Sequence, residues 1–331
     1  PLGVDFSTDT LGVASLESLA PVQAAVRALA GMPDFTASLG RAVVHVRNNV
    51  LSQPLGFELG LTRRVSLRVT VPFVTATSEV DFRFNPAGHE ATLGFNPTLS
   101  TPAALTANAQ LLSQFDSATS QLTRRIAFCS ANAAAAGCGL VNASASSAAA
   151  LVQTARAFAA TLGQVYGGRA GAKGQLFVPV AGTAAQAAIE ARVAGYKALF
   201  ATFGANAIFA SGPFAAQAPL TATGAQGLLT DSVFGIGASP LATSVTRGMG
   251  DIDFTMKVNL LDTRRHRAGS PGAPPRFSWR QSVSGTYRLG TGKLDAPGDF
   301  TDLGTGDHQN DVEVRSYTDL LYRDRFWVSV T

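Results

Sequence analysis

The sequence predicts a mainly β fold: an antiparallel transmembrane β-barrel, present as a fragment, with a large Ala-rich α-helical insertion. Three observations lead to this prediction. Charged residues make up only 15% of the 331 residues, against roughly 25% in a typical soluble domain. Several segments alternate apolar and polar residues with a period of two. The mean hydropathy is only +0.16, and no apolar run reaches the length of about 18 residues expected of a membrane-crossing helix.

The first barrel strands are expected within residues 41–98, after a lead-in at residues 1–40 that contains a helix at 16–30. Between residues 65 and 74 the odd positions are apolar and the even positions mostly polar, which is typical of a half-buried strand. Such a strand faces lipid in a barrel or a core in a soluble sandwich, and periodicity alone does not separate the two. Residues 79–84 and 90–95, on either side of Asn85-Pro86-Ala87-Gly88, predict a β-hairpin.

Residues 99–230 change character and predict a helical insertion. Ala dominates, and apolar residues recur at helical spacing in residues 101–128, 144–162 and 183–203. Thr183 is a typical residue at a helix start. We therefore expect three helices packed as a small bundle.

Strand signals return in residues 231–331, at 251–261, 277–289, 311–321 and 326–330. The chain starts at Pro1 without Met and ends inside the last of these segments. We expect a fragment that has lost its signal peptide and is truncated at its C-terminus.

The connections between strands alternate in length. Short turns are expected at residues 62–64 and 323–325, whereas the connections at 76–248 and 290–310 are long. Outer-membrane barrels have short periplasmic turns and longer extracellular loops. This pattern predicts that the helical insertion faces the cell exterior.

Seven charged residues fall on the polar sides of the expected strands and are candidates for facing a barrel lumen: Arg68, Lys257, Arg280, Arg288, Arg315, Asp253 and Glu313. In a lumen they would set solute preference or form structural ion pairs, and both roles stay open. The net charge is +4, and the arginines are scattered rather than clustered with aromatics. A nucleic-acid partner is therefore not expected.

The sequence carries no recognisable catalytic or cofactor motif, so neither an enzyme nor a bound cofactor is expected. The four histidines lack zinc-site spacing. Asp302, Asp307 and Asp311 lie in an acidic loop that would suit Ca²⁺, but without EF-hand spacing a hydrated loop is the favoured interpretation. Cys129 and Cys138 are either free thiols or a local disulfide, and we favour the disulfide in an oxidising compartment.

Five short motifs resemble a known family. They are GFELGLTRRVSL at residues 56–67, VTVPF at 69–73, GMGDI at 248–252, LGTGK at 289–293, and LGTG at 303–306 followed by Asp311. Together they resemble the strands of outer-membrane transporters grouped with phenol meta-cleavage pathway proteins, over residues 54–75 and 248–330. The resemblance implies a closed antiparallel barrel with a channel role and no catalytic residues. The helical region 99–230 departs from that family's pattern.

Two functions follow as expectations. The first is a bacterial outer-membrane channel or transporter for small solutes, embedded in outer-membrane lipid and capped by the helices. The second is a structural or surface-interaction protein, in which the barrel anchors an exposed bundle at residues 99–230 that binds a protein partner or a neighbouring copy.

Overall fold

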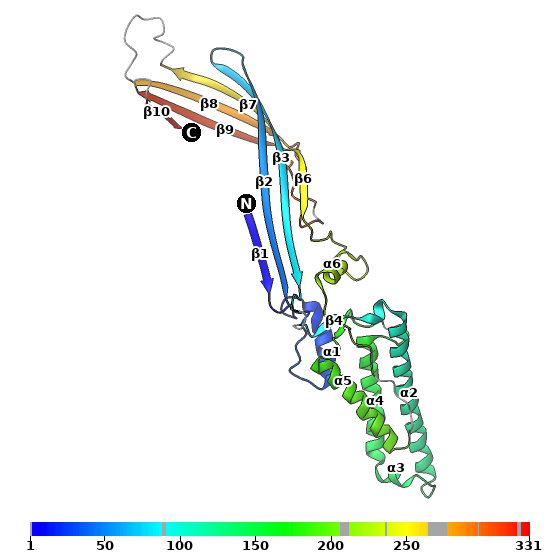
Figure 1. Ribbon diagram of the computed structural model, residues 1–331. Helices are drawn as coiled ribbons and strands as arrows, with labels where there is room; N and C mark the ends of the chain where they lie inside the picture. The colour runs from blue at the N-terminus through cyan, green and yellow to red at the C-terminus, as the bar shows by residue number, and fades with distance from the viewer. Residues whose placement is uncertain are drawn as a thin grey trace, which may run out of the picture. The chain divides into compact units, whose positions relative to one another are not determined.

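The chain forms two compact units in the structure, which is a computed structural model. The structure describes residues 2–87, 91–171, 173–205, 212–235, 237–263, 277–296, 298–322 and 326–331. Unit 1 comprises Pro1–Asp5, His45–Asp81 and Ala238–Thr331, and unit 2 comprises Phe6–Val44 and Phe82–Gly237. Unit 1 contains most of the strands and unit 2 the helices (Figure 1).

An 8-stranded sheet builds unit 1, and its pairs β3–β6, β3–β7, β7–β8, β8–β9 and β9–β10 are antiparallel. Its order is β1-β2-β3-β7-β8-β9-β10, and β6 also pairs with β3. The strands are β1 (Leu2–Thr8), β2 (Ala42–Gly60), β3 (Val65–Phe84), β6 (Ser244–Met249), β7 (Ile252–Asp262), β8 (Phe277–Leu289), β9 (Asp311–Tyr322) and β10 (Phe326–Val330). Among the described strands no pairing joins β1 to β10, so the predicted antiparallel sheet is present and is open over these residues.

A short turn joins β2 to β3, as the sequence predicts. The backbone amides of Leu61 and Thr62 donate to the carbonyl of Val65. The second predicted turn, at residues 323–325, lies outside the described residues.

Strands β6 and β7 share one edge of β3 and are separated by a bulge at Gly250 and Asp251. Phe73 pairs with Met249 and Val69 with Phe254. At the bulge the amide of Gly250 donates to the carbonyl of Pro72 over 2.8 Å. Because the bulge inserts one extra residue opposite β3, the alternation shifts by one: even-numbered residues of β6 and odd-numbered residues of β7 lie on the same face of the sheet.

The registers place mainly apolar side chains on one face of the sheet and mainly polar side chains on the other. We call one the apolar face; its members include Leu67, Val69, Phe254, Met256, Val283, Tyr287, Val312, Val314, Leu320, Phe326 and Val328. The polar face carries Ser66, Arg68, Asp253, Thr255, Lys257, Arg280, Ser282, Ser284, Thr286, Arg288, Glu313, Arg315 and Asp319.

Burial runs opposite to that of a water-soluble domain. On the apolar face Val312 is 76% exposed and Val314 72%, whereas on the polar face Ser282 and Ser284 are only 2% exposed. Apolar residues of a soluble sheet normally face its core. Nothing in the described part of the chain covers this face.

Unit 2 is a helical bundle with its own apolar core. Its helices are α1 (Ala20–Ala30), α2 (Pro102–Ala131), α3 (Gly139–Ala143), α4 (Ala145–Tyr166), α5 (Ala184–Thr202) and α6 (Ala222–Thr230), with short 3-10 turns at Glu17–Leu19 and Pro97–Leu99. Thus α2, α4 and α5 confirm the three predicted helices. The Thr183 side chain accepts from the Gln186 amide at the start of α5, as a helix-capping residue does.

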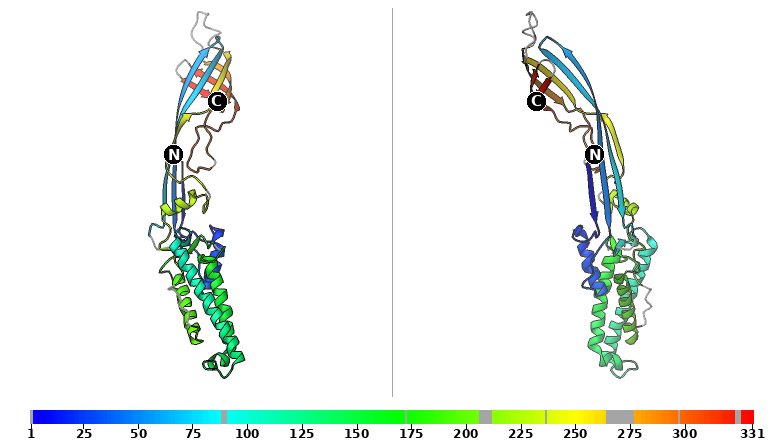
Figure 2. Two further views of the ribbon diagram at one scale, coloured as in Figure 1. Left: turned by 90° about the vertical axis from the view of Figure 1, so that its right-hand side faces the viewer. Right: turned by 60° about the vertical axis from the view of Figure 1, so that its left-hand side comes forward.

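Small residues allow α2 and α4 to lie side by side (Figure 2). Ala118, Ala148 and Ala155 are fully buried. Between the helices the rings of Phe115, Phe158 and Tyr196 meet, with centroids 4.9 to 5.8 Å apart. None of the helices in the described ranges is long and apolar enough to cross a membrane.

The N-terminal region is part of the bundle. The sequence interprets residues 1–40 as a lead-in to the barrel, but α1 packs against α4 and α5. The Arg192 guanidinium donates to the carbonyls of Ala28 and Leu29 over 2.6 and 2.9 Å. Unit 2 therefore begins well before residue 99.

The predicted hairpin around Asn85 is wrong. Strand β3 runs unbroken to Phe84, and β4 (Leu93–Phe95) pairs with β5 (Phe177–Pro179) instead of with residues 79–84. Gly88 and Glu90 of that prediction lie outside the described residues.

Asn85 ties three segments of unit 2 together. Its Oδ1 accepts from the Arg41 amide, and its Nδ2 donates to the carbonyls of Leu39 and Leu220. Gly40, at φ +96°, passes so close that an added Cβ would lie 1.8 Å from Asn85 Oδ1. Asn85, which the sequence suggests is a turn residue, therefore makes long-range contacts in the fold.

Replacing Phe115 by Ala should destabilise unit 2 strongly. Phe115 is fully buried at the aromatic contact, and such a truncation costs about 3–5 kcal/mol. The measurement is urea unfolding of the purified chain, followed by the helical circular dichroism signal. Phe128→Ala is the matched control, because Phe128 is 55% exposed and surface changes cost about 0.5 kcal/mol or less. Equal midpoints for the two variants would contradict this core.

Candidate functional site: the polar face and the loop on it

The polar face brings together all seven charged residues that the sequence predicts to face a lumen. Asp253 is paired with Arg288, and Thr255 with Arg68. Ser284 lies between Lys257 and Arg315, Thr286 opposite Glu313, and Arg280 opposite Asp319. Residues directly opposite each other in an antiparallel sheet share a face. All seven charged residues therefore lie on the same face of one sheet.

Three of the arginines contact carboxylates. Arg288 Nε lies 2.9 Å from Asp253 Oδ1, and Arg315 Nε lies 2.5 Å from Glu313 Oε1. Arg280 lies 3.6 Å from Asp262 and 3.9 Å from Asp319. These side chains are partly exposed, and such pairs contribute about 0–1 kcal/mol each. These ion pairs contribute little to the stability of the fold. Their main effect is to hold the charged groups at defined positions on the polar face.

Arg68 and Lys257 differ from the other cations. Lys257 Nζ lies 4.7 Å from the centroid of the Tyr317 ring, a cation–π contact. Within the described residues, neither cation has a carboxylate at ion-pair distance. Among these residues neither cation is therefore held in an ion pair, and the carboxylate on the β2 side, Glu58, accepts from the Ser66 hydroxyl instead.

The loop at residues 290–310 is held by carboxylates that accept hydrogen bonds. Asp251 Oδ1 accepts from the Gly292 amide over 2.8 Å, and Oδ2 from the Asp307 amide over 3.2 Å. Asp302 accepts from the Thr246 hydroxyl and from the Lys293 ammonium group. These carboxylates therefore accept hydrogen bonds from donors of the loop itself and from β6.

The Ca²⁺ candidates are not gathered into a cation site. Asp302 and Asp307 hold the loop, and Asp311 begins β9 opposite Arg288. No group of three or more metal-binding side chains is found in the described ranges.

Hydrogen bonds lower the pKa of three loop carboxyls. The Thr301 amide and hydroxyl lower the pKa of Asp299, and the Thr246 hydroxyl followed by Lys293 lowers that of Asp302. The Gln309 amide has the largest effect in lowering the pKa of Asp307. All three groups favour the charged form, which is the form that accepts these bonds.

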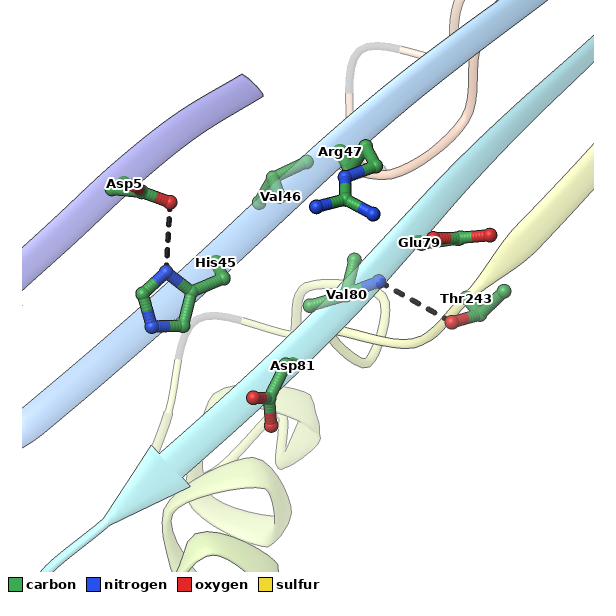
Figure 3. Close-up of a pocket in the computed structure, with 8 residues that line it drawn as sticks. All are labelled: Asp5, His45, Val46, Arg47, Glu79, Val80, Asp81 and Thr243. Atoms are coloured by element: carbon green, nitrogen blue, oxygen red, sulfur yellow. Dashed lines mark hydrogen bonds and ion pairs between the residues drawn. The ribbon is translucent and has the colours of Figure 1, made fainter. Parts of the chain in front are cut away.

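A separate pocket in unit 1, of about 790 Å³, lies between β1, β2 and β3 (Figure 3). His45 Nδ1 lies 2.7 Å from Asp5 Oδ1, and Arg47, Glu79 and Asp81 complete the charged lining. His45 is one of the four histidines that lack zinc-site spacing in the sequence. Its contact with Asp5 depends on β1 pairing with β2, which no local pattern in residues 1–40 indicates.

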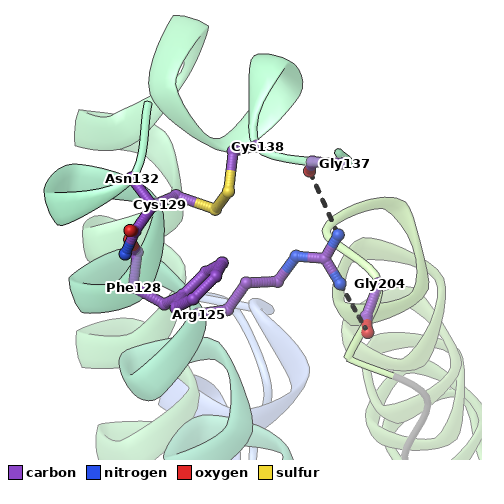
Figure 4. The surroundings of a disulfide bond; sticks show 7 residues. All are labelled: Arg125, Phe128, Cys129, Asn132, Gly137, Cys138 and Gly204. Carbon is purple, nitrogen blue, oxygen red and sulfur yellow. Dashed lines mark hydrogen bonds between the residues drawn. A yellow bond between two sulfur atoms is a disulfide. The ribbon is translucent and has the colours of Figure 1, made fainter. Parts of the chain in front are cut away.

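In unit 2, Cys129 and Cys138 form the disulfide that the sequence favours (Figure 4). Beside it the Arg125 guanidinium donates to the carbonyls of Gly137 and Gly204. The bond therefore closes the loop after α2, and Arg125 links that loop to the end of α5.

Comparison with family models, with curated proteins and with solved structures gives no match to this chain. The transporter-like motifs remain an expectation from sequence, and the polar face carries the functional argument.

Acid should release loop 290–310. Because the pKa of Asp299, Asp302 and Asp307 is lowered, their contribution is complete above the unfolded value of about 3.9 and is lost as pH falls through the lower folded values. Hydrogen exchange of the loop amides, corrected for the intrinsic pH dependence, should therefore speed up below about pH 4. Helix α4 is the control, because it contains no Asp or Glu. Unchanged loop protection in acid would contradict this role.

Proposed function

We propose that this chain forms part of the wall of an outer-membrane β-barrel that passes small solutes. One observation carries the proposal: the sheet exposes its apolar face and turns its charged residues to the other face. Lipid provides an apolar medium for the first face, and a water-filled lumen suits the second. In a soluble sandwich the apolar face would lie against a core.

Strand length agrees with this proposal. Strands β7, β8 and β9 contain 11, 13 and 12 residues, and a tilted strand needs about 9–11 residues to cross a bilayer. The much longer β2 and β3 would extend beyond the membrane.

Aromatic side chains gather at one end of these strands. The rings of Phe277 and Tyr322 lie 4.9 Å apart, and those of Tyr322 and Phe326 lie 6.4 Å apart. Aromatic girdles at the membrane interface are typical of such barrels. This end also carries the short turn at residues 61–64, so we assign it to the periplasmic rim.

The same proposal requires the sheet edges to be joined. Unpaired backbone groups are costly in lipid, so the edges of the sheet at the level of β7 to β9, which are β2 and β10, would be joined through further strands. In the resulting lumen, Arg68 and Lys257 would favour small anions over cations, because neither is in an ion pair with a carboxylate of the described residues.

Lipid quenching of tryptophan tests which face meets the membrane. The chain has 2 Trp; Trp279 lies on the apolar face, and Trp327, opposite Leu321, lies on the polar face. In liposomes of brominated lipid, Trp327→Phe should leave a strongly quenched Trp279. Trp279→Phe, the matched variant, should leave a weakly quenched Trp327, since its face meets water. Weak quenching of Trp279 would contradict the membrane wall.

Planar bilayer recordings test the channel. The full-length protein should give discrete conductance steps, with a reversal potential in a salt gradient that favours anions. Replacing Arg68 and Lys257 together by Gln should move that potential toward cations. A folded protein that is quenched by lipid but gives no steps would contradict solute passage and leave an anchoring role.

A further inference from the structure

Loop 290–310 lies on the polar face of the sheet, the face that would enclose the lumen. On β3, Val74, Ala76 and Ser78 alternate in phase with Ser66 and Arg68. They pair with Gly248, Thr246 and Ser244 of β6, which therefore share that face. The bulge at Gly250 shifts the alternation by one residue, so that these residues lie on the same face as Asp253, Thr255 and Lys257 of β7.

The contacts of the loop are with these same β6 residues. The Ser244 hydroxyl donates to the Thr301 carbonyl, and the Thr246 hydroxyl donates to Asp302 over 2.9 Å. A Cβ added at Gly248 would lie 3.5 Å from Thr305 Cγ2. Thr301 is 3% exposed and Ala76 is 1% exposed. The loop thus covers the polar face at β6 and the adjoining part of β3.

The bulge between β6 and β7 holds both ends of the loop. The hydroxyls of Thr291 and Thr305 donate to the carbonyls of Gly250 and Met249, over 2.9 and 2.7 Å. Asp251 accepts from the amides of Gly292 and Asp307. A bulge redirects backbone and side chain from the regular ladder, which here makes Asp251 available to both loop segments.

Glycine is required where the two ends meet. A Cβ at Gly292 would lie 2.6 Å from Gly306 Cα, and a Cβ at Gly306 would lie 2.5 Å from Asp251 Oδ2. A side chain at either position would push the ends apart. The close approach is therefore built into the sequence of the loop.

We propose that residues 290–310 form an inward-folded constriction at the mouth of the channel, latched by Asp251 at the β6–β7 bulge. This inference rests on the proposed barrel, in which the polar face of β3 continues past the ends of β7 to β9 and is covered by the loop beside β6. The loop narrows the channel mouth, and Asp251 sets how firmly the loop is held. Weakening this latch widens the mouth.

A cross-link tests the position of the loop. Cysteines replacing Gly248 and Thr305 should join readily on mild oxidation, because their side chains would be in contact. The bond is detected by mass spectrometry of peptides, apart from the native Cys129–Cys138 bond. Cysteines replacing Gly298 and Gly248 are the matched control; a Cβ at Gly298 meets nothing within 4 Å, so they should not join. Failure of the first pair to join would overturn the proposal.

Single-channel recording tests the constriction. Asp251→Ala should give steps about twofold larger than those of the unaltered protein, because the loop leaves the lumen. Asp34→Ala, which removes an exposed carboxylate from unit 2, should leave the step size unchanged. A cross-linked loop with unchanged Asp251→Ala steps would overturn the constriction alone. Absence of steps from every variant would contradict the channel itself, and the cross-link would still decide where the loop lies.

Discussion

The exposure of one apolar sheet face is the constraint on which the rest of this structure depends. Burying a side chain such as Val, Leu or Phe contributes about 1.5–3 kcal/mol relative to leaving it in water. Strands β7 to β10 expose such residues in rows, while serines on the opposite face are buried. A sheet of this kind needs an apolar medium around it. In the function proposed above, membrane insertion would supply that medium, and the charged polar face would then line an aqueous space.

The sequence predicts what depends on local periodicity. Alternation in residues 65–74 identifies β3, and helical spacing identifies α2, α4 and α5. Close spacing of two cysteines was enough to favour their disulfide. The same alternation assigns Arg68 and Lys257 to one face, because side-chain direction is fixed by strand parity. Alternation in the sequence does not show which medium each face meets. That inference needs the exposed fractions of the side chains on both faces, which only the structure gives.

The features that the sequence missed depend on pairing between distant segments. Asn85 looks like a turn residue, yet its amide joins segments near residues 40 and 220. The acidic residues of loop 290–310 suggest a hydrated loop or a cation site, yet Asp302 binds Thr246. The bulge at Gly250 and Asp251 holds loop 290–310 beside β6. No pattern within either segment specifies its partner.

The most direct test is a spin-label scan along β8 in liposomes, at each position from 282 to 289. Oxygen partitions into lipid and a nickel chelate stays in water, so their collision rates report the medium at each side chain. The account predicts that positions 283, 285, 287 and 289 are open to oxygen, and that 282, 284, 286 and 288 favour the nickel chelate, in a period of two. High nickel accessibility at both sets would contradict a membrane wall.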